Sequence, residues 1–135
     1  MIKSYADLEQ SKKLAEILPL ESADMHYPDY YFDGNAKGPC NTPYKEAIED
    51  LLHVYINPKT KRLLPCWSLA ALLKVIPKKI KDFNVLRIDI NEKDFSIWYD
   101  EIGIGVNTEL PDITMECPVD ACVNMIEKLH DLNLL

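Results

Sequence analysis

The chain has 135 residues and a formal net charge of -7, with 47% hydrophobic and 27% charged residues. These proportions are those of a globular protein, and the length suits a single domain, residues 1–135, with a core of its own. No apolar run approaches the roughly 20 residues that a membrane helix needs, so we expect no membrane-spanning helix. We expect a cytoplasmic protein, because the first residues lack the apolar stretch of a secretory signal.

Two helices are predicted in the first part of the chain. Apolar residues recur at helical spacing over residues 4–18, and Pro19 ends that segment. A second amphipathic stretch covers residues 43–53, with Thr42 suited to the N-cap position. Residues 20–42 have no periodicity and are rich in turn-forming residues, so we predict an irregular loop there.

The longest apolar run, residues 63–77, lies in the middle of the chain. Ser68 is a natural N-cap, and Pro77 marks the end of the helical pattern. A helix that is apolar nearly all round is buried on most of its sides. We therefore predict that this segment, with Trp67 at its start, forms the central core helix.

After this helix the pattern changes to strands. Alternation of apolar and polar residues predicts four strands, at residues 85–90, 95–99, 102–106 and 113–115. A last helix is predicted after Cys117, which takes the cap position, with Pro118 in the first turn. This order predicts an α+β fold in which helices pack on one face of a small antiparallel β-meander.

Three segments resemble a family of small uncharacterised proteins that occur in prophages and integrative elements of anaerobic gut bacteria. The segments are Leu8–Met25, Pro65–Leu73 and Pro118–Ile126. Their matching residues are mostly apolar or helix-capping, so the resemblance implies a shared helix framework and a mobile-element origin. It implies no activity, and no catalytic residue is carried over from it.

Charge is unevenly distributed along the chain. The segment Lys59–Lys81 holds seven bases and no acid, whereas residues 84–116 hold eight acids against Arg87 and Lys93. A basic segment is a candidate for nucleic-acid binding, and the alternative is a solvated face. The bases lack interleaved aromatic residues and the whole chain is acidic, so nucleic-acid binding is not favoured.

The irregular loop contains an aromatic-acidic cluster. Its aromatic members are Tyr27, Tyr30, Tyr31 and Phe32. Aromatic residues dominate recognition surfaces, so we predict that these four contact a protein partner. The alternative is that they cover the core.

Two further groups are alternatives for chemistry. Asp24, His26 and Asp29 have the ligand types for a divalent cation, although their spacing matches no known metal motif. Cys117 stands at a helix N-terminus, where the helix dipole favours a thiolate. A cysteine nucleophile also needs a base, and the chain has three histidines, His26, His53 and His130.

The four cysteines, Cys40, Cys66, Cys117 and Cys122, form no CxxC pair, so we predict structural free thiols. Disulfides or metal ligation are the alternatives.

We predict a mobile-element accessory protein that binds another protein through the aromatic-acidic loop and an acidic sheet face. It is expected to be a monomer or a weak homo-oligomer without a cofactor, rather than an enzyme.

Overall fold

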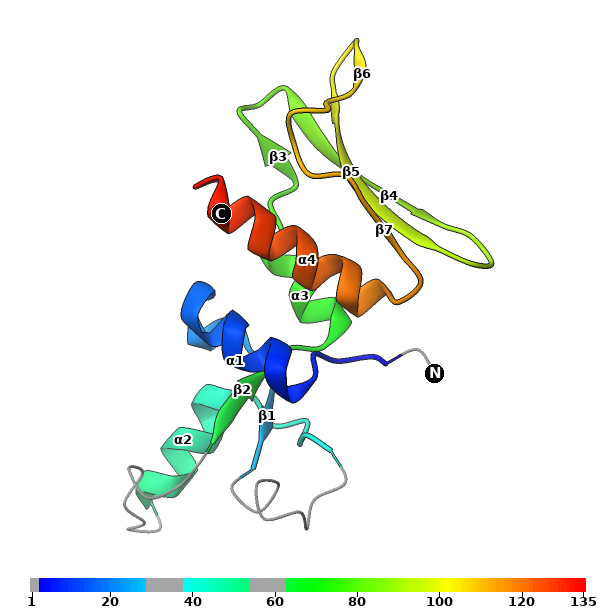
Figure 1. The fold of residues 1–135 in the computed structure, drawn as a ribbon. Helices are drawn as coiled ribbons and strands as arrows, with labels where there is room; N and C mark the ends of the chain where they lie inside the picture. Colours follow the sequence, from blue (N-terminus) through cyan, green and yellow to red (C-terminus); the bar gives the residue numbers. More distant parts are fainter. Residues whose placement is uncertain (1–2, 29–37, 54–62) are drawn as a thin grey trace. The chain divides into compact units, whose positions relative to one another are not determined.

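The computed structural model describes residues 3–28, 38–53 and 63–135 (Figure 1). They form an α+β fold of four α-helices and antiparallel strands, which confirms the predicted fold class. The chain groups into two compact units. We call residues 5–71 the helical unit, and residues 72–135 with the segment up to Ser4 the sheet unit. The single domain predicted from the sequence stays a prediction. No described helix is both long and apolar enough to span a bilayer.

The helical unit is built around a short two-stranded antiparallel sheet, in which Met25 lies opposite Cys66. Its elements are α1 (Leu8–Ile17), the 3-10 helix η1 (Leu20–Ser22), β1 (Met25–Tyr27), α2 (Tyr44–His53) and β2 (Leu64–Cys66). Helix α3 (Leu69–Val75) begins in this unit. Helix α2 agrees with the prediction for residues 43–53, whereas β1 lies in a segment that the sequence predicts as loop.

Helix α1 begins later than the pattern of residues 4–18 predicts. Its N-cap is Asp7, whose carboxylate accepts a hydrogen bond from the Gln10 amide at 2.8 Å. The Gln10 side chain accepts one from the Asp7 amide at 3.0 Å, which completes a capping box. Tyr5 forms an isolated bridge with Ser68, so the chain before Asp7 is extended.

The tryptophan-bearing segment differs in part from the core helix that the sequence predicts, because residues 64–66 form strand β2 and α3 leaves Ala70 and Lys74 exposed. The burial of Trp67 itself agrees with the prediction. Trp67 is 0% exposed, and its indole nitrogen donates to the Ser22 hydroxyl at 2.9 Å. Ser68 caps α3 as expected, because its hydroxyl accepts from the Ala71 amide at 3.2 Å. The Asp24 carboxylate in turn accepts from the Ser68 amide at 2.9 Å and from its hydroxyl.

The sheet unit holds five antiparallel strands and the last helix. They are β3 (Lys79–Ile80), β4 (Asn84–Ile90), β5 (Phe95–Glu101), β6 (Gly105–Val106), β7 (Ile113–Met115) and α4 (Pro118–Asp131). The strand order is β3-β4-β5-β6, and β7 pairs with the other end of β5. Helix α4 packs against β5 and β7 (Figure 1).

The core of the sheet unit follows from strict alternation along β5. Phe95, Ile97 and Tyr99 are buried, and the residues between them are partly exposed. Helix α4 contributes a buried apolar stripe, which includes Val119, Cys122, Val123, Ile126 and Leu129. The Tyr99 hydroxyl donates to the Pro77 carbonyl at 2.7 Å, so the only polar atom of this buried side chain has a hydrogen-bond partner.

The strand predicted at residues 102–106 is wrong in most of its length. Strand β5 continues to Glu101, a tight turn follows at Ile102–Ile104, and only Gly105 and Val106 pair with β5. Gly103 has φ 83°, a left-handed conformation that glycine adopts without strain. The two isoleucines of the turn are consequently exposed.

Candidate functional site

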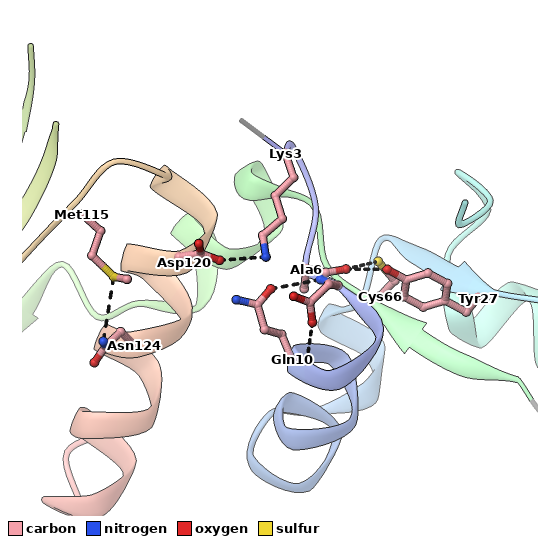
Figure 2. Close-up of polar contacts among 9 residues, drawn as sticks. Lys3, Ala6, Gln10, Tyr27, Cys66, Met115, Asp120 and Asn124 are labelled. Carbon is pink, nitrogen blue, oxygen red and sulfur yellow. Dashed lines mark hydrogen bonds and ion pairs between the residues drawn. The ribbon is translucent and has the colours of Figure 1, made fainter. Parts of the chain in front are cut away.

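The aromatic residues predicted to contact a partner are only partly within the described chain. Tyr27 is 1% exposed, and its hydroxyl donates to the Ala6 carbonyl at 2.7 Å (Figure 2). The Cys66 thiol approaches the same carbonyl. The structure therefore assigns Tyr27 to the core of the helical unit, which is the alternative interpretation of this cluster. Tyr30, Tyr31 and Phe32 lie outside the described residues.

Two of the three proposed metal ligands, Asp24 and His26, bond to other groups. The Asp24 carboxylate binds Ser68, and the His26 Nδ1 atom is 2.7 Å from the Thr42 carbonyl oxygen. Asp29 lies outside the described residues. Among the residues that the structure describes, no three histidine, cysteine, aspartate or glutamate side chains group so as to hold a metal ion.

Cys117 is the N-cap of α4, as predicted, and is partly buried. Its thiol makes no capping hydrogen bond. The histidine of the sheet unit, His130, is near the other end of the same helix, about 20 Å away at 1.5 Å per residue. His26 bonds within the helical unit, and the His53 side chain is outside the described part. Thiol catalysis therefore stays an untested alternative.

The predicted basic segment is only partly described. Lys59, Lys61 and Arg62 lie outside the described residues. Lys78 donates to the carbonyls of Leu73 and Ile76, so it caps the C-terminal end of α3. This use of a lysine is structural and needs no nucleic acid.

The acidic sheet face is less acidic than the count along the chain indicates. Five of the eight acids of residues 84–116 lie outside the strands. On the strand face turned away from α4, Asp100 accepts hydrogen bonds from Arg87 at 3.3 Å and from the Trp98 indole at 2.8 Å. The face is therefore a mixed polar surface.

The described surface has another feature, a hollow of about 710 Å³ at one end of the sheet unit, which we call the tip hollow. Its apolar wall includes Phe83, Ile104, Val106, Leu132 and Leu134, and its charged rim includes Lys81, Glu101 and Glu109. Phe83 is 65% exposed and Ile104 is 76% exposed. The tip hollow thus presents large apolar side chains to solvent.

Two neighbouring turns hold the apolar wall in place. In the turn between β3 and β4, Lys81 has φ 53° and Asp82 has φ 61°. Consecutive left-handed residues match the twist of a hairpin but are unfavourable for most residues other than glycine, asparagine and aspartate, so the strain falls mainly on Lys81. The Ile102 amide, in the next turn, donates to the Phe83 carbonyl at 2.8 Å. This hydrogen bond ties the two turns together at the end of the sheet (Figure 1).

Two of the residues that line the tip hollow, Asn84 and Asn107, form a hydrogen-bond network. Asn84 is buried, and its side-chain amide donates to the Ile80 carbonyl at 3.1 Å. Its side-chain oxygen accepts from the side-chain amide of Asn107 at 2.9 Å. The backbone amide of Asn107 donates to the Tyr99 carbonyl at 2.9 Å. Because buried polar groups are costly unless paired, this network holds the loop after β6 against β4 and β5.

The C-terminal segment completes the wall. Asn133 has φ 58°, and the Leu134 amide donates to the Leu129 carbonyl at 2.9 Å. This is the six-to-one bond of a Schellman motif, in which asparagine can replace the usual glycine. The motif turns the chain at the end of α4 and brings Leu132 and Leu134 to the tip hollow.

The chemistry of the tip hollow is suited to binding. The residues that line it include no histidine, cysteine or serine, so they offer no nucleophile paired with a histidine base. They do offer apolar contact area, side-chain amides and two carboxylates on the rim.

Comparison of the chain with known family models, curated proteins and solved structures finds no match.

Sequence reasoning missed the tip hollow for identifiable reasons. Gly103 and Gly105 were a signal for a turn, yet the alternating isoleucines favoured a strand. Lys81 and Asp82 adopt left-handed angles without any glycine, so only Asp82, a residue type that tolerates such angles, marks that turn. The wall also combines segments far apart in sequence, which periodicity cannot bring together.

The two buried thiols predict a pH dependence of stability. Burial raises the pKa of Cys66 and of Cys122 from 9.0 to about 12. Above about pH 9 the unfolded chain loses both protons while the folded chain keeps them, so their full contribution is present below pH 9 and is lost as the pH rises toward 12. We expect the free energy of unfolding to fall by up to about 1.4 kcal/mol per pH unit for each thiol.

Urea unfolding in reducing buffer at about pH 8 and about pH 10 measures this slope, and Cys122→Ala should remove about half of the thiol contribution. A slope that is unchanged in both Cys122→Ala and Cys66→Ala would contradict the assignment.

Proposed function

We propose that this chain is a non-catalytic binding protein that holds a partner protein at the tip hollow. The observation that carries the proposal is the clustering of exposed apolar side chains there. Nine large apolar residues are exposed in the described chain, and four of them, Phe83, Ile104, Val106 and Leu132, line this one hollow. Single exposed apolar residues are ordinary, whereas a concave cluster with a polar rim is typical of an interaction site.

The rim indicates the chemistry of the partner. Glu101 and Glu109 stand beside the apolar wall, with Lys81 as the one base among the lining residues. The fitting partner is a peptide segment with a large apolar side chain for the hollow and a lysine or arginine for the rim carboxylates.

The cellular setting that we propose for this function rests on the resemblance of residues 8–25, 65–73 and 118–126 to proteins of mobile elements. We propose an accessory protein of a mobile element that acts in the cytoplasm and meets its partner there. The aromatic residues Tyr30, Tyr31 and Phe32 stay part of the proposal as a second contact region. An enzyme that uses Cys117 or the loop with Asp24, His26 and Asp29 is the alternative.

The proposal is tested with a displayed library of random peptides selected against the whole chain. Enriched peptides should share an apolar anchor flanked by a base. They should bind the Ile104→Asp variant at least about tenfold more weakly, because a charge then occupies the apolar wall.

The matched control is Leu20→Asp, which places the same charge at an exposed leucine of the helical unit and should leave the affinity unchanged. Enriched peptides that bind Ile104→Asp as tightly as the unmodified chain would contradict the tip hollow as the site.

A further inference from the structure

A cysteine and a histidine stand opposite each other in the helical unit. His26, the middle residue of β1, forms an isolated antiparallel bridge with Cys40. The His26 amide donates to the Cys40 carbonyl at 3.1 Å, and the Cys40 amide donates to the His26 carbonyl at 2.8 Å. Residues that exchange both hydrogen bonds carry their side chains on the same face, with β-carbons about 4.5–5.5 Å apart. The thiol and the imidazole are therefore neighbours.

The carbonyl of Thr42 fixes the proton on the imidazole. The Nδ1 atom of His26 is 2.7 Å from the Thr42 carbonyl oxygen. A carbonyl oxygen can only accept a hydrogen bond, so Nδ1 is the donor and carries a proton. In the neutral ring the other nitrogen, Nε2, can then accept a proton. A histidine that is oriented by a third group and lies beside a thiol is the arrangement that activates a cysteine nucleophile.

The burial of the two residues suits this chemistry. His26 is buried, whereas Cys40 is only partly buried, so a small molecule can reach the thiol from solvent. On the other side of His26, β2 places the buried Pro65 opposite it. Interactions between charges are stronger where water is excluded, so the buried imidazolium stabilises a thiolate beside it.

The other cysteine of the helical unit faces away from this pair. Cys66 lies opposite Met25, which is next to His26 in β1, so the Cys66 side chain is on the opposite face of the small sheet. It is fully buried, and burial raises its pKa to about 12. A thiol with that pKa is not ionised at neutral pH and does not attack a disulfide. A disulfide between Cys40 and a small molecule is therefore not passed on to Cys66.

We propose that Cys40 and His26 form a thiol–imidazole pair that captures a small disulfide as a mixed disulfide. The thiol proton moves to Nε2 of His26, directly or through one water molecule. The Cys40 thiolate then attacks one sulfur of the small disulfide, whose sulfur–sulfur bond breaks. The electron pair leaves on the other sulfur, which takes the proton from His26. Cys40 is oxidised and half of the small disulfide is released as a reduced thiol, so the exchange needs no further reactant.

A metal site does not fit these two residues. Two side chains are too few for a protein metal site, and within the described part of the chain no third histidine, cysteine, aspartate or glutamate joins them. The pair belongs to the helical unit, whereas the residues of the tip hollow belong to the sheet unit. The inference therefore goes beyond the proposed function and does not depend on it.

The probe for this pair is glutathione disulfide. The full chain with its cysteines reduced is incubated with the probe at neutral pH, and mass spectrometry of its peptides gives the rate at each cysteine. Cys40 should react at least about tenfold faster than Cys117. Cys117 is the matched comparison, because it is also partly buried but is far from His130, the histidine of its own unit. Cys66 and Cys122 are buried and should stay unmodified, so they report that the chain is folded.

The His26→Asn variant separates the base from the structural hydrogen bond. The asparagine amide can still donate to the Thr42 carbonyl but cannot take a proton from a thiol. The rate at Cys40 should fall about tenfold at neutral pH. It should match the unmodified chain at about pH 10, where a cysteine thiol ionises without a base. The control His130→Asn, at an exposed histidine of α4, should leave the rate at Cys40 unchanged.

Equal rates at Cys40 and Cys117 in the unmodified chain would overturn the proposal, and so would a Cys40 rate that His26→Asn leaves unchanged at neutral pH. A rate lowered by the same factor at neutral and at alkaline pH would assign His26 a purely structural role and also overturns the pair. If the probe modifies Cys66 or Cys122 in the variant, the variant is unfolded. The comparison of Cys40 with Cys117 in the unmodified chain then decides.

Discussion

Replacing Trp67 with alanine is expected to lower the free energy of unfolding by about 3–5 kcal/mol, a large part of the stability of a small protein. The side chain is fully buried, and its removal leaves a cavity beside the capped start of α3. It also leaves the Ser22 hydroxyl without its indole donor. Urea unfolding followed by circular dichroism measures the loss.

Trp98 provides the matched control. It is only partly buried, on the sheet face turned away from α4, and its indole bonds to Asp100 near the surface. Trp98→Ala should cost about 1 kcal/mol. If Trp67→Ala fails to fold, Trp67→Phe keeps the comparison measurable, because it retains most of the buried ring. Equal losses at the two tryptophans would contradict the interior role of Trp67.

The second large effect is expected at Tyr99 in the sheet unit. Tyr99→Ala should also cost about 3–5 kcal/mol, because the ring is fully buried beneath α4 in the row with Phe95 and Ile97. Tyr99→Phe retains the ring and removes only the hydrogen bond to the Pro77 carbonyl, so about 1 kcal/mol is expected. Thermal and urea unfolding measure both.

Ser96→Ala, on the opposite face of β5, is the control and should change stability by less than about 1 kcal/mol. A loss in Tyr99→Ala no larger than in Ser96→Ala would contradict the packing of the sheet core. The same experiments address the domain prediction. A single domain requires that Trp67→Ala and Tyr99→Ala lower one common unfolding transition, although the two residues belong to different compact units.

Local signals in the sequence predicted several elements well. The hydroxyl of Ser68 and the cysteine-proline step before α4 marked two helix starts, which are decided by residues within one turn. The turn at residues 91–94, which separates the first two predicted strands, is equally local, since Asn91 accepts from the amides of Lys93 and Asp94. Short strands were harder to predict. Strand β1 exists because β2 pairs with it from almost 40 residues away, and nothing within residues 25–27 announces that partner.

The sequence by itself determined the α+β class, the positions of the main helices and the burial of Trp67, because helix caps and apolar periodicity act over a few residues. The tertiary structure alone decided which apolar residues stay exposed. Ile104 and Phe83 have the hydrophobicity of core residues, but they lie in turns at the end of the sheet and stay exposed. Tyr27 has the chemistry of a contact residue, but strand pairing places it inside. Exposure depends on which distant segments pack together, and that is a property of the folded chain.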